Sequence, residues 1–138
     1  MADRGRLKRE RVKGGRSILP PAHVPDTGTL TPHFAFDEMV VGYCIADCDR
    51  DLKAAFADAL WSRSKMTWLD ITLAPRHGLG SEQIRRGSIK VPIPRTVTED
   101  VDHFLAVRFQ GLAPMVGYRV GRVFHVLWLD HTFTVYDH

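Results

Sequence analysis

Arginines in the last third of the sequence stand in runs of β-branched and aromatic residues, and a tyrosine and a histidine follow them. The four side chains of interest are Arg108, Arg119, Tyr136 and His138. Guanidinium groups bind phosphate oxygens in a bidentate manner and stabilise negative charge that develops on phosphorus. Tyrosine and histidine side chains transfer protons. Side chains of these types could bind a phosphate group and exchange protons with it, if the fold brings them together.

Further basic residues predict a wider surface for a polyanion. Between residues 76 and 122 there are eight basic and four acidic residues, whereas the stretch 37–58 is acidic. The candidates for contacts with RNA in this region are Arg76, His77, Arg85, Arg86 and Arg122. One basic face is the footprint expected for a nucleic-acid partner. A solvated charged surface, with an ordinary loop at residues 76–77, is the alternative.

The cysteine and histidine spacing is not that of a metal centre. Cys44 and Cys48 are the only two cysteines, four residues apart, and His33 does not complete a zinc spacing. We interpret them as buried or inert thiols in a strand, and we interpret His125 and the three tryptophans as core residues. No serine or cysteine triad and no phosphate-binding glycine loop is recognisable. The sequence therefore predicts neither a metal nor a cofactor.

Length and charge distribution predict one domain preceded by a basic arm. A chain of 138 residues can bury one hydrophobic core. Residues 1–16 carry a net charge of +5, which leaves −2 for the other 122 residues. Residues 1–30 contain few large apolar side chains, so we expect a flexible arm there and a single domain over residues 31–138. No secretory signal or membrane-length apolar run is visible, which predicts a cytoplasmic protein without a membrane partner.

Hydrophobic periodicity predicts a strand and two helices in the first half of the domain. The apolar run Met39–Ile45 predicts a buried strand. Apolar residues at helical spacing predict a helix over Arg50–Ser62, behind an aspartate-rich capping segment. Thr67 and Asp70 have the spacing of a capping box, which predicts a second, shorter helix.

The second half of the domain has the pattern of an antiparallel sheet. Ile89–Ile93 alternates with prolines and predicts an edge strand or an extended segment. Four further β-rich runs are separated by short turns: Phe104–Gln110, Met115–Val120, Arg122–Leu129 and Thr132–Tyr136. Short connections make neighbouring strands antiparallel. The predicted fold class is therefore α+β, with two helices packed on a C-terminal antiparallel β-meander.

The turns predict which side chains share a face of that sheet. A two-residue loop of Val120 and Gly121 would place Arg119 opposite Arg122. A four-residue loop over Gly111–Pro114 would place Arg108 opposite Gly117, and alternation would then put all three arginines on one face. The other face is almost entirely apolar, and we expect the helices to cover it. Like charges on neighbouring strands destabilise a sheet. An arginine face of this kind therefore suits phosphate binding better than stability.

The last predicted strand has two alternative orientations. With a two-residue turn at residues 130–131, Tyr136 and His138 would lie on the apolar face beside His125. With a three-residue turn they would lie on the arginine face. A slip of one residue reverses every side chain of a strand, and the sequence leaves both orientations open.

The order of the last elements is a Gly/Tyr/Arg strand, an aliphatic strand and a Tyr/His end. The residues in this pattern are Arg108–Gly111, Gly117–Val120, Val123–Asp130 and Tyr136–His138. In this pattern the chain resembles the RelE/ParE-like (HigB-like) toxin superfamily of bacterial toxin–antitoxin systems. The resemblance covers about residues 33–138. The basic arm and the region Phe34–Ile45 depart from the pattern of that family.

The resemblance implies a toxin that is a metal-independent endoribonuclease, a hydrolase of the mRNA-interferase kind. In such an enzyme Arg108 and Arg119 would hold the phosphate, and Tyr136 and His138 would transfer protons while a ribose 2′-hydroxyl attacks the phosphate. The implied partners are RNA, free or bound to a ribosome, and a cognate antitoxin protein. The alternatives are a ParE-like toxin that binds a protein target such as gyrase without catalysis, and a non-catalytic nucleic-acid-binding module.

Overall fold

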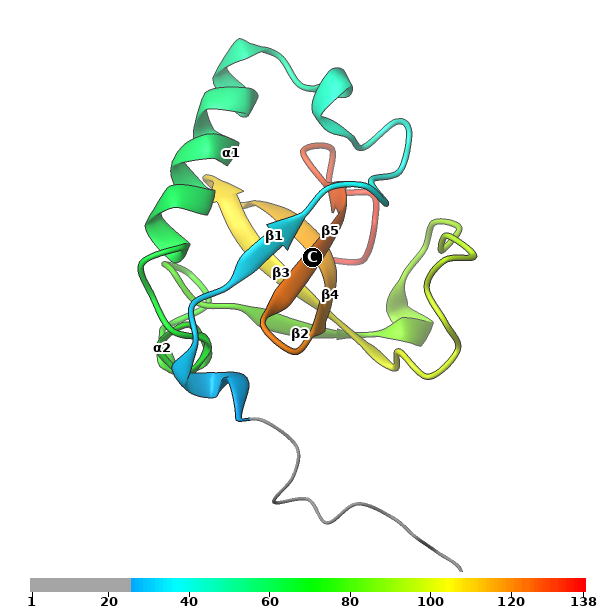
Figure 1. Cartoon of the computed structure of the whole chain (residues 1–138). Helices are drawn as coiled ribbons and strands as arrows, with labels where there is room; N and C mark the ends of the chain where they lie inside the picture. The colour runs from blue at the N-terminus through cyan, green and yellow to red at the C-terminus, as the bar shows by residue number, and fades with distance from the viewer. Residues whose placement is uncertain (1–25) are drawn as a thin grey trace, which may run out of the picture.

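The computed structural model describes residues 26–138, in which a five-stranded sheet lies at the centre of an α+β fold (Figure 1). Its strands are β1 (His33–Ala35), β2 (Glu82–Arg85), β3 (His103–Gln110), β4 (Ala113–Val120) and β5 (Val123–Leu129). Their order across the sheet is β1-β5-β4-β3-β2. β3, β4 and β5 form an antiparallel meander, β2 pairs antiparallel with β3, and β1 pairs parallel with β5. The predicted fold class is confirmed.

Both predicted helices are present and begin at the predicted capping residues. α1 spans Arg50–Arg63, one residue longer than predicted, and the Asp49 side chain accepts a backbone hydrogen bond of 2.8 Å at its start. α2 spans Trp68–Leu73 and begins with the predicted capping box of Thr67 and Asp70. These side chains satisfy backbone N–H groups that have no partner within the helix, which explains why the helices begin there.

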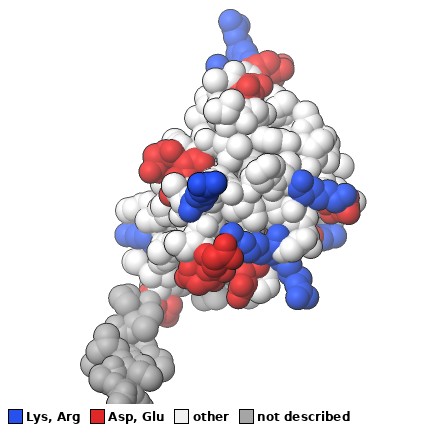
Figure 2. Space-filling view, turned by 90° about the vertical axis from the view of Figure 1, so that its right-hand side faces the viewer, with Lys and Arg blue, Asp and Glu red and all other residues white. Residues whose placement is uncertain are grey.

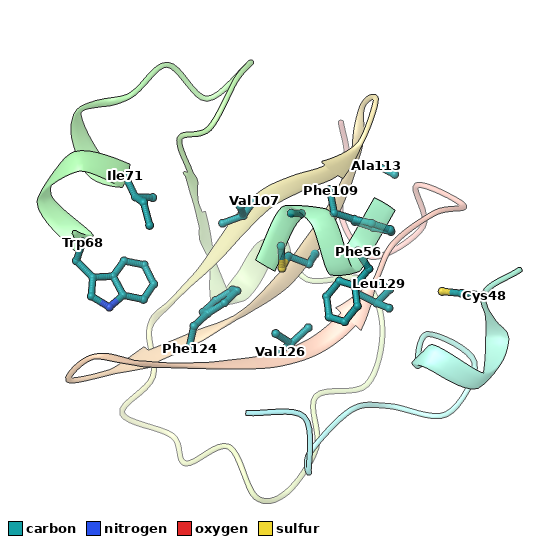
Figure 3. Close-up of a cluster of buried hydrophobic side chains, with 12 residues drawn as sticks. Cys48, Phe56, Trp68, Ile71, Val107, Phe109, Ala113, Phe124, Val126 and Leu129 are labelled. Atoms are coloured by element: carbon teal, nitrogen blue, oxygen red, sulfur yellow. The ribbon is translucent and has the colours of Figure 1, made fainter. Parts of the chain in front are cut away.

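The two helices cover one face of the sheet, here called the helix face. Figure 3 shows Phe56 of α1 and Trp68 of α2 pointing toward side chains of the strands. The rings of Phe56 and Phe109 meet edge to face at 6.0 Å, and those of Trp68 and Phe124 do so at 6.1 Å. Edge-to-face contacts of this kind add to the free energy gained by burying the rings.

The opposite face, here called the loop face, is covered by residues 86–102 and by the final segment, residues 130–138 (Figure 1). Phe104, Leu127 and Trp128 are fully buried on this face. Val135 packs among them, and its carbonyl accepts a hydrogen bond of 2.7 Å from the Lys90 amide. An arginine face was expected opposite the helices. The loop face is instead also apolar, and the loop and the final segment cover it.

The β4–β5 hairpin turns one residue later than predicted. Arg119 pairs with Phe124 and not with Arg122, so the loop consists of Gly121 and Arg122. Gly121 has a φ of 61°, a left-handed conformation that glycine adopts without a steric penalty. Arg122 therefore lies in the loop and is not a strand residue.

A β-bulge in β5 further changes which residues share a face. Val116 pairs with Trp128, whereas the next residue, Gly117, pairs with Val126. Leu127 is the extra residue, so Leu127 and Trp128 both lie on the loop face. The predicted alternation, which placed Trp128 on the same face as Phe124, is wrong for this reason.

Arg108 and Arg119 lie on opposite faces of the sheet. Leu105 pairs with Gly117, and Arg119 lies two residues beyond Gly117, so all three share the helix face. Arg108 is an odd number of residues from Leu105 and lies on the loop face. The prediction of a single face with Arg108, Arg119 and Arg122 is therefore wrong, because the β3–β4 loop has two residues in place of the expected four and a bulge lies between Arg108 and Gln110.

Two segments that were predicted as strands are not strands. Met39–Ile45 consists of turns, although Val40 donates a hydrogen bond of 2.9 Å to the Leu127 carbonyl and so lies alongside β5. Cys44 and Cys48 therefore do not lie in a strand, and Cys48 is buried behind a short 3₁₀ turn. Thr132–Tyr136 is not a strand either.

On the other edge of the sheet, β2 was not predicted. It precedes the segment Ile89–Ile93, which is extended but forms no strand. The prolines at positions 92 and 94 carry no amide donor, which explains why the alternating pattern there does not join the sheet. The edge strand is instead the short run without prolines that pairs with the start of β3.

Residues 26–30, which were predicted to belong to the arm, are part of the folded domain. Thr27–Thr29 forms a 3₁₀ turn, and the Trp68 amide donates a hydrogen bond of 3.0 Å to the Leu30 carbonyl. The rest of the predicted arm, residues 1–25, lies outside the described residues. Within residues 26–138, no helix has the length and apolar character needed to cross a membrane.

Candidate functional site

A pocket on the loop face brings together several of the predicted site residues. It lies where β3 and β4 meet the final segment and has a volume of about 100 Å³. Its lining consists of Arg76, Glu82, Ala106, Arg108, Leu112, Pro114, Tyr136, Asp137 and His138. Three of the four predicted catalytic residues, Arg108, Tyr136 and His138, line this pocket, here called the loop-face pocket.

Asp130 positions the final segment beside the sheet. This residue is fully buried, and its amide donates a hydrogen bond of 2.9 Å to the Pro114 carbonyl of β4. Its carboxylate accepts hydrogen bonds from the backbone amides of Thr134 at 2.8 Å and Val135 at 3.1 Å. These bonds hold a tight turn in which Phe133 has a φ of 59°, a region that residues other than glycine rarely adopt. The final segment therefore folds back on the sheet and does not extend it.

The same carboxylate orients His138. The Nε2 atom of His138 lies 3.1 Å from Oδ2 of Asp130. In the neutral ring, a hydrogen bond from Nε2 to this carboxylate leaves Nδ1 without a proton, so that Nδ1 can act as a base. The His138 ring stacks on Tyr136 with 4.0 Å between centroids, and the edge contact with Phe133 is 5.0 Å. The imidazole is thus held in one orientation by a hydrogen bond and two aromatic contacts.

Tyr136 is a neutral proton donor in this pocket. Burial, together with the negative charges of Glu82 and Asp130, raises the pKa of Tyr136 to about 12. Arg108 and Arg76 act in the opposite direction but do not cancel that effect. A phenol with this pKa keeps its proton at neutral pH and can give it to a more basic oxygen.

Among the described residues that line this pocket, Arg108 is a cation that is free to meet a ligand. Arg76 is paired with Glu82 at 2.9 Å, and Lys90 is paired with Asp137 at 2.7 Å. Within residues 26–138, no carboxylate lies within ion-pair distance of Arg108, which is partly buried in the pocket wall. A half-buried guanidinium without a counter-ion favours an anionic ligand.

Arg119 and Arg122 are not in the loop-face pocket, and both contact the first described residues. Arg119 donates to the Gly121 carbonyl and to the hydroxyl of Thr27, each at 2.7 Å. Its guanidinium lies 4.4 Å from the centre of the Trp68 ring. Arg122 donates to the carbonyl and the hydroxyl of Thr31, each at 3.0 Å. Both arginines thus attach residues 27–31 to the β4–β5 hairpin.

The remaining predicted RNA contacts are scattered. Arg86 donates to the carbonyls of Thr98 and Val101 at 2.8 and 3.0 Å and so closes the loop that covers the loop face. Arg85 is exposed on β2, and His77 is exposed between α2 and β2. Figure 2 shows the side of the molecule with residues 86–102, where basic and acidic side chains alternate without forming one basic patch. The single basic face that was predicted is not present on this side.

Sequence reasoning missed Asp130, Glu82 and Phe133 as site residues. Asp130 was interpreted only as part of a turn, although an aspartate ahead of a Thr-x-Thr run is a signal for carboxylate-to-amide hydrogen bonds. Glu82 lies on the strand that was not predicted. Phe133 is 44% exposed next to His138, and nothing in its sequence context marked it.

His125 and Trp128 are packed in the sheet and take no part in the pocket. The His125 ring stacks on Tyr118 at 4.7 Å, and the Tyr118 hydroxyl donates a hydrogen bond of 2.6 Å to Glu38. Trp128 is fully buried against Phe104. The interpretation as core residues is confirmed for Trp68 and Trp128, but His125 is only half-buried and Trp61 is 66% exposed, so it is wrong for Trp61. His125 and Trp128 each keep a buried ring nitrogen without a partner in the described part of the chain.

No cluster of three or more His, Cys, Asp or Glu side chains suited to a metal ion is found among residues 26–138.

Comparison with known proteins found no matching family model, no matching curated protein and no matching solved structure. Functional inference for this chain therefore depends on the geometry of its own residues.

Proposed function

We propose that this domain cleaves RNA without a metal ion, by attack of a ribose 2′-hydroxyl on the adjacent phosphate. The observation that carries the proposal is the meeting of Arg108, Tyr136 and His138 in one pocket, with His138 held by the buried Asp130. Such a reaction needs a base, an acid and a cation near one phosphate. The loop-face pocket offers one side chain for each of these tasks.

In the proposed reaction, Nδ1 of His138 removes the proton of the 2′-hydroxyl, and the oxygen attacks phosphorus. Arg108 stabilises the additional negative charge on the phosphate oxygens. The Tyr136 hydroxyl donates its proton to the leaving 5′-oxygen as the P–O bond breaks. The products are a 2′,3′-cyclic phosphate and a 5′-hydroxyl, and transfer of the proton from His138 through solvent to Tyr136 restores the enzyme.

The size of the pocket agrees with this proposal. A volume of about 100 Å³ is below the roughly 300–1,000 Å³ of pockets that enclose a small molecule. A ligand would therefore place one group in the pocket, and the remainder would lie across the surface. A single phosphate of an RNA strand meets this requirement, and the exposed Leu112 and Phe133 at its rim offer apolar surface to neighbouring bases.

The proposed biological role is that of a toxin held inactive by an antitoxin, as the resemblance of the last third to RelE/ParE-like toxins implies. This part of the proposal is supported by that resemblance alone. A ParE-like toxin or a nucleic-acid-binding module would need Arg108 for contact but would not need the proton transfers of His138 and Tyr136. An assay for RNA cleavage therefore distinguishes the proposed enzyme from these non-catalytic proteins.

The decisive experiment is cleavage of a mixed RNA by the purified full chain, alone and with ribosomes, in the presence of a metal chelator. We expect products with 2′,3′-cyclic phosphate ends, and we expect Arg108→Ala and His138→Ala to abolish them. Arg95→Ala and His33→Ala, which remove exposed side chains of the same types outside the pocket, are the matched controls. Binding of RNA without cleavage in either preparation would reduce the pocket to a docking surface.

A further inference from the structure

A row of basic side chains crosses the helix face, away from the loop-face pocket. Arg85 of β2 pairs directly with His103 of β3. Leu105 pairs with Gly117. His103 lies two residues before Leu105 and Arg119 two residues after Gly117, so both lie on the same face as this pair. Three adjacent strands thus contribute Arg85, His103 and Arg119 across two strand spacings, roughly 10 Å.

The row borders an open groove of about 410 Å³ between α2 and the sheet. The lining residues are Trp68, Thr72, Ser81, Gln83, His103, Leu105 and Arg119. They supply a guanidinium, an imidazole, a side-chain amide and the hydroxyl of Ser81, but no carboxylate, while the Thr72 hydroxyl donates to the Trp68 carbonyl at 2.9 Å.

Arg119 is fixed in position and keeps donors for a ligand. Nε and Nη2 are held by Gly121 and Thr27, and the Trp68 ring supports one face of the guanidinium. Within the described residues, Nη1 makes no hydrogen bond, so its two N–H donors remain available. Burial lowers the pKa of Arg119, while Asp26 raises it. The side chain is thus partly desolvated and pre-organised, which reduces the entropy lost on binding an anion.

We propose that this helix-face groove binds the phosphate groups of a nucleotide. Like charges on neighbouring strands destabilise a sheet unless an anion lies between them. Guanidinium and imidazole donors on adjacent strands, with the Ser81 hydroxyl ahead of β2, match the oxygens of a phosphate. The volume is within the roughly 300–1,000 Å³ range of small-molecule sites. A nucleoside diphosphate in solution and a nucleotide within an RNA strand share this chemistry.

The groove and the loop-face pocket are separate sites on opposite faces of the sheet. β2 supplies both, because Glu82 lines the loop-face pocket and the next residue, Gln83, lines the groove. Binding in the groove therefore does not depend on RNA cleavage in the pocket. A variant that removes cleavage, such as His138→Ala, should bind nucleotide phosphates in the groove as the wild type does.

The test is calorimetric titration of the full chain with pyrophosphate, and with malonate as a dicarboxylate comparison. We expect millimolar or tighter binding of pyrophosphate and at least tenfold weaker binding of malonate. The double variant Arg85→Ala/His103→Ala, which removes two exposed side chains, should raise the Kd for pyrophosphate at least tenfold, and Arg119→Lys should do the same through loss of the planar fork. Arg95→Ala is the control, and melting temperatures verify that each variant is folded.

The proposal would be overturned if the protein did not bind pyrophosphate at 10 mM, or if it bound malonate equally well. It would also be overturned if Arg108→Ala lost pyrophosphate binding while the groove variants kept it. Two further titrations, with ADP and with a five-nucleotide RNA, identify the source of the phosphate. Tighter binding of ADP assigns the groove to a free nucleotide, and tighter binding of the RNA assigns it to a strand. A wild-type protein that binds pyrophosphate but does not cleave RNA would contradict only the proposed RNA cleavage.

Discussion

Asp130 is the residue on which the geometry of the loop-face pocket depends. Its carboxylate accepts two backbone hydrogen bonds and one from His138, all within a fully buried site. A buried carboxylate is stable only when its oxygens are satisfied in this way. One side chain therefore fixes both the course of the final segment and the orientation of the proposed base.

Replacement of Asp130 by Asn should lower the free energy of unfolding by about 2–3 kcal/mol. The amide has one acceptor oxygen in place of two, so a buried backbone N–H loses its partner, and hydrogen bonds to a charged group are among the stronger ones. Urea denaturation measures the loss. Asp137→Asn, at an exposed carboxylate whose ion pair with Lys90 contributes little, should change stability by less than about 1 kcal/mol. Equal effects of the two changes would contradict the central position of Asp130.

Tyr136→Phe isolates the proposed proton donor. The substitution removes the hydroxyl but keeps the ring that stacks on His138 at 4.0 Å. We expect RNA cleavage to slow about 100-fold, the typical contribution of a general acid, while the melting temperature stays nearly unchanged. The matched control is Tyr118→Phe, which removes a hydroxyl from the other end of the sheet, where it contacts Glu38. An unchanged rate in Tyr136→Phe would assign the protonation of the leaving oxygen to another group.

The two buried tyrosines also predict how stability depends on alkaline pH. The pKa values of Tyr118 and Tyr136 are raised to about 12, chiefly by burial. An unfolded tyrosine loses its proton near pH 10, so between pH 10 and 12 the unfolded state binds fewer protons than the folded state. The contribution of these two tyrosines to the free energy of unfolding should therefore be constant below pH 10 and fall above it, by roughly 2 kcal/mol for each tyrosine. Denaturation of the double Phe variant at pH 9 and 11.5 should show a smaller decrease.

At the scale of elements, the helices and the meander could be predicted because their signals are local. Capping residues and short turns act within a few positions, and the Asp49 and Thr67 caps are where the sequence placed them. The final segment reads as a strand, but the carboxylate of Asp130 binds the amides that a strand would use. That competition depends on the burial of Asp130 beneath β4, which no local pattern contains.

The register of the β4–β5 hairpin could not be predicted because a glycine at the centre of the sheet determines it. A Cβ atom on Gly117 would lie 1.9 Å from the His125 carbonyl oxygen, so the two strands approach there more closely than any other residue permits. This close approach adjoins the β-bulge that shifts Trp128 to the loop face. The sequence shows Gly117 in a strand, but the contact with His125 exists only in the folded sheet.

Gly117→Ala should therefore destabilise the domain by about 3 kcal/mol, the upper range for overpacking, because the added methyl group meets rigid backbone. Gly87→Ala is the matched control, since no atom lies within 4 Å of a Cβ atom built there. Chemical denaturation of both variants gives the comparison. A Gly117→Ala protein as stable as the control would show that β4 and β5 can separate without loss of the core.

On the scale of the whole molecule, the sequence identified useful residue types but not their partition between two sites. Three of the four predicted catalytic residues meet in one pocket, and Arg119 lies on the opposite face. Membership of a face depends on register, and a shorter β3–β4 loop with a bulge next to Arg108 was enough to separate Arg108 from Arg119. Arg119 has fixed contacts with Thr27 and Trp68, so its replacement should affect stability as well as any binding.

The proposed toxin role makes a prediction for the intact chain in cells. Expression of the wild type in a bacterial host should arrest growth, because uncontrolled RNA cleavage stops protein synthesis. Arg108→Ala and His138→Ala should remove the arrest at equal levels of soluble protein, whereas Arg95→Ala should keep it, since Arg95 is exposed outside the pocket. Co-expression of a small acidic protein encoded beside this chain should restore growth, because complementary charge speeds its association with the basic residues. Harmless expression of soluble wild-type protein would contradict the toxin role, and cleavage of RNA by the same preparation would then assign the enzyme to another task.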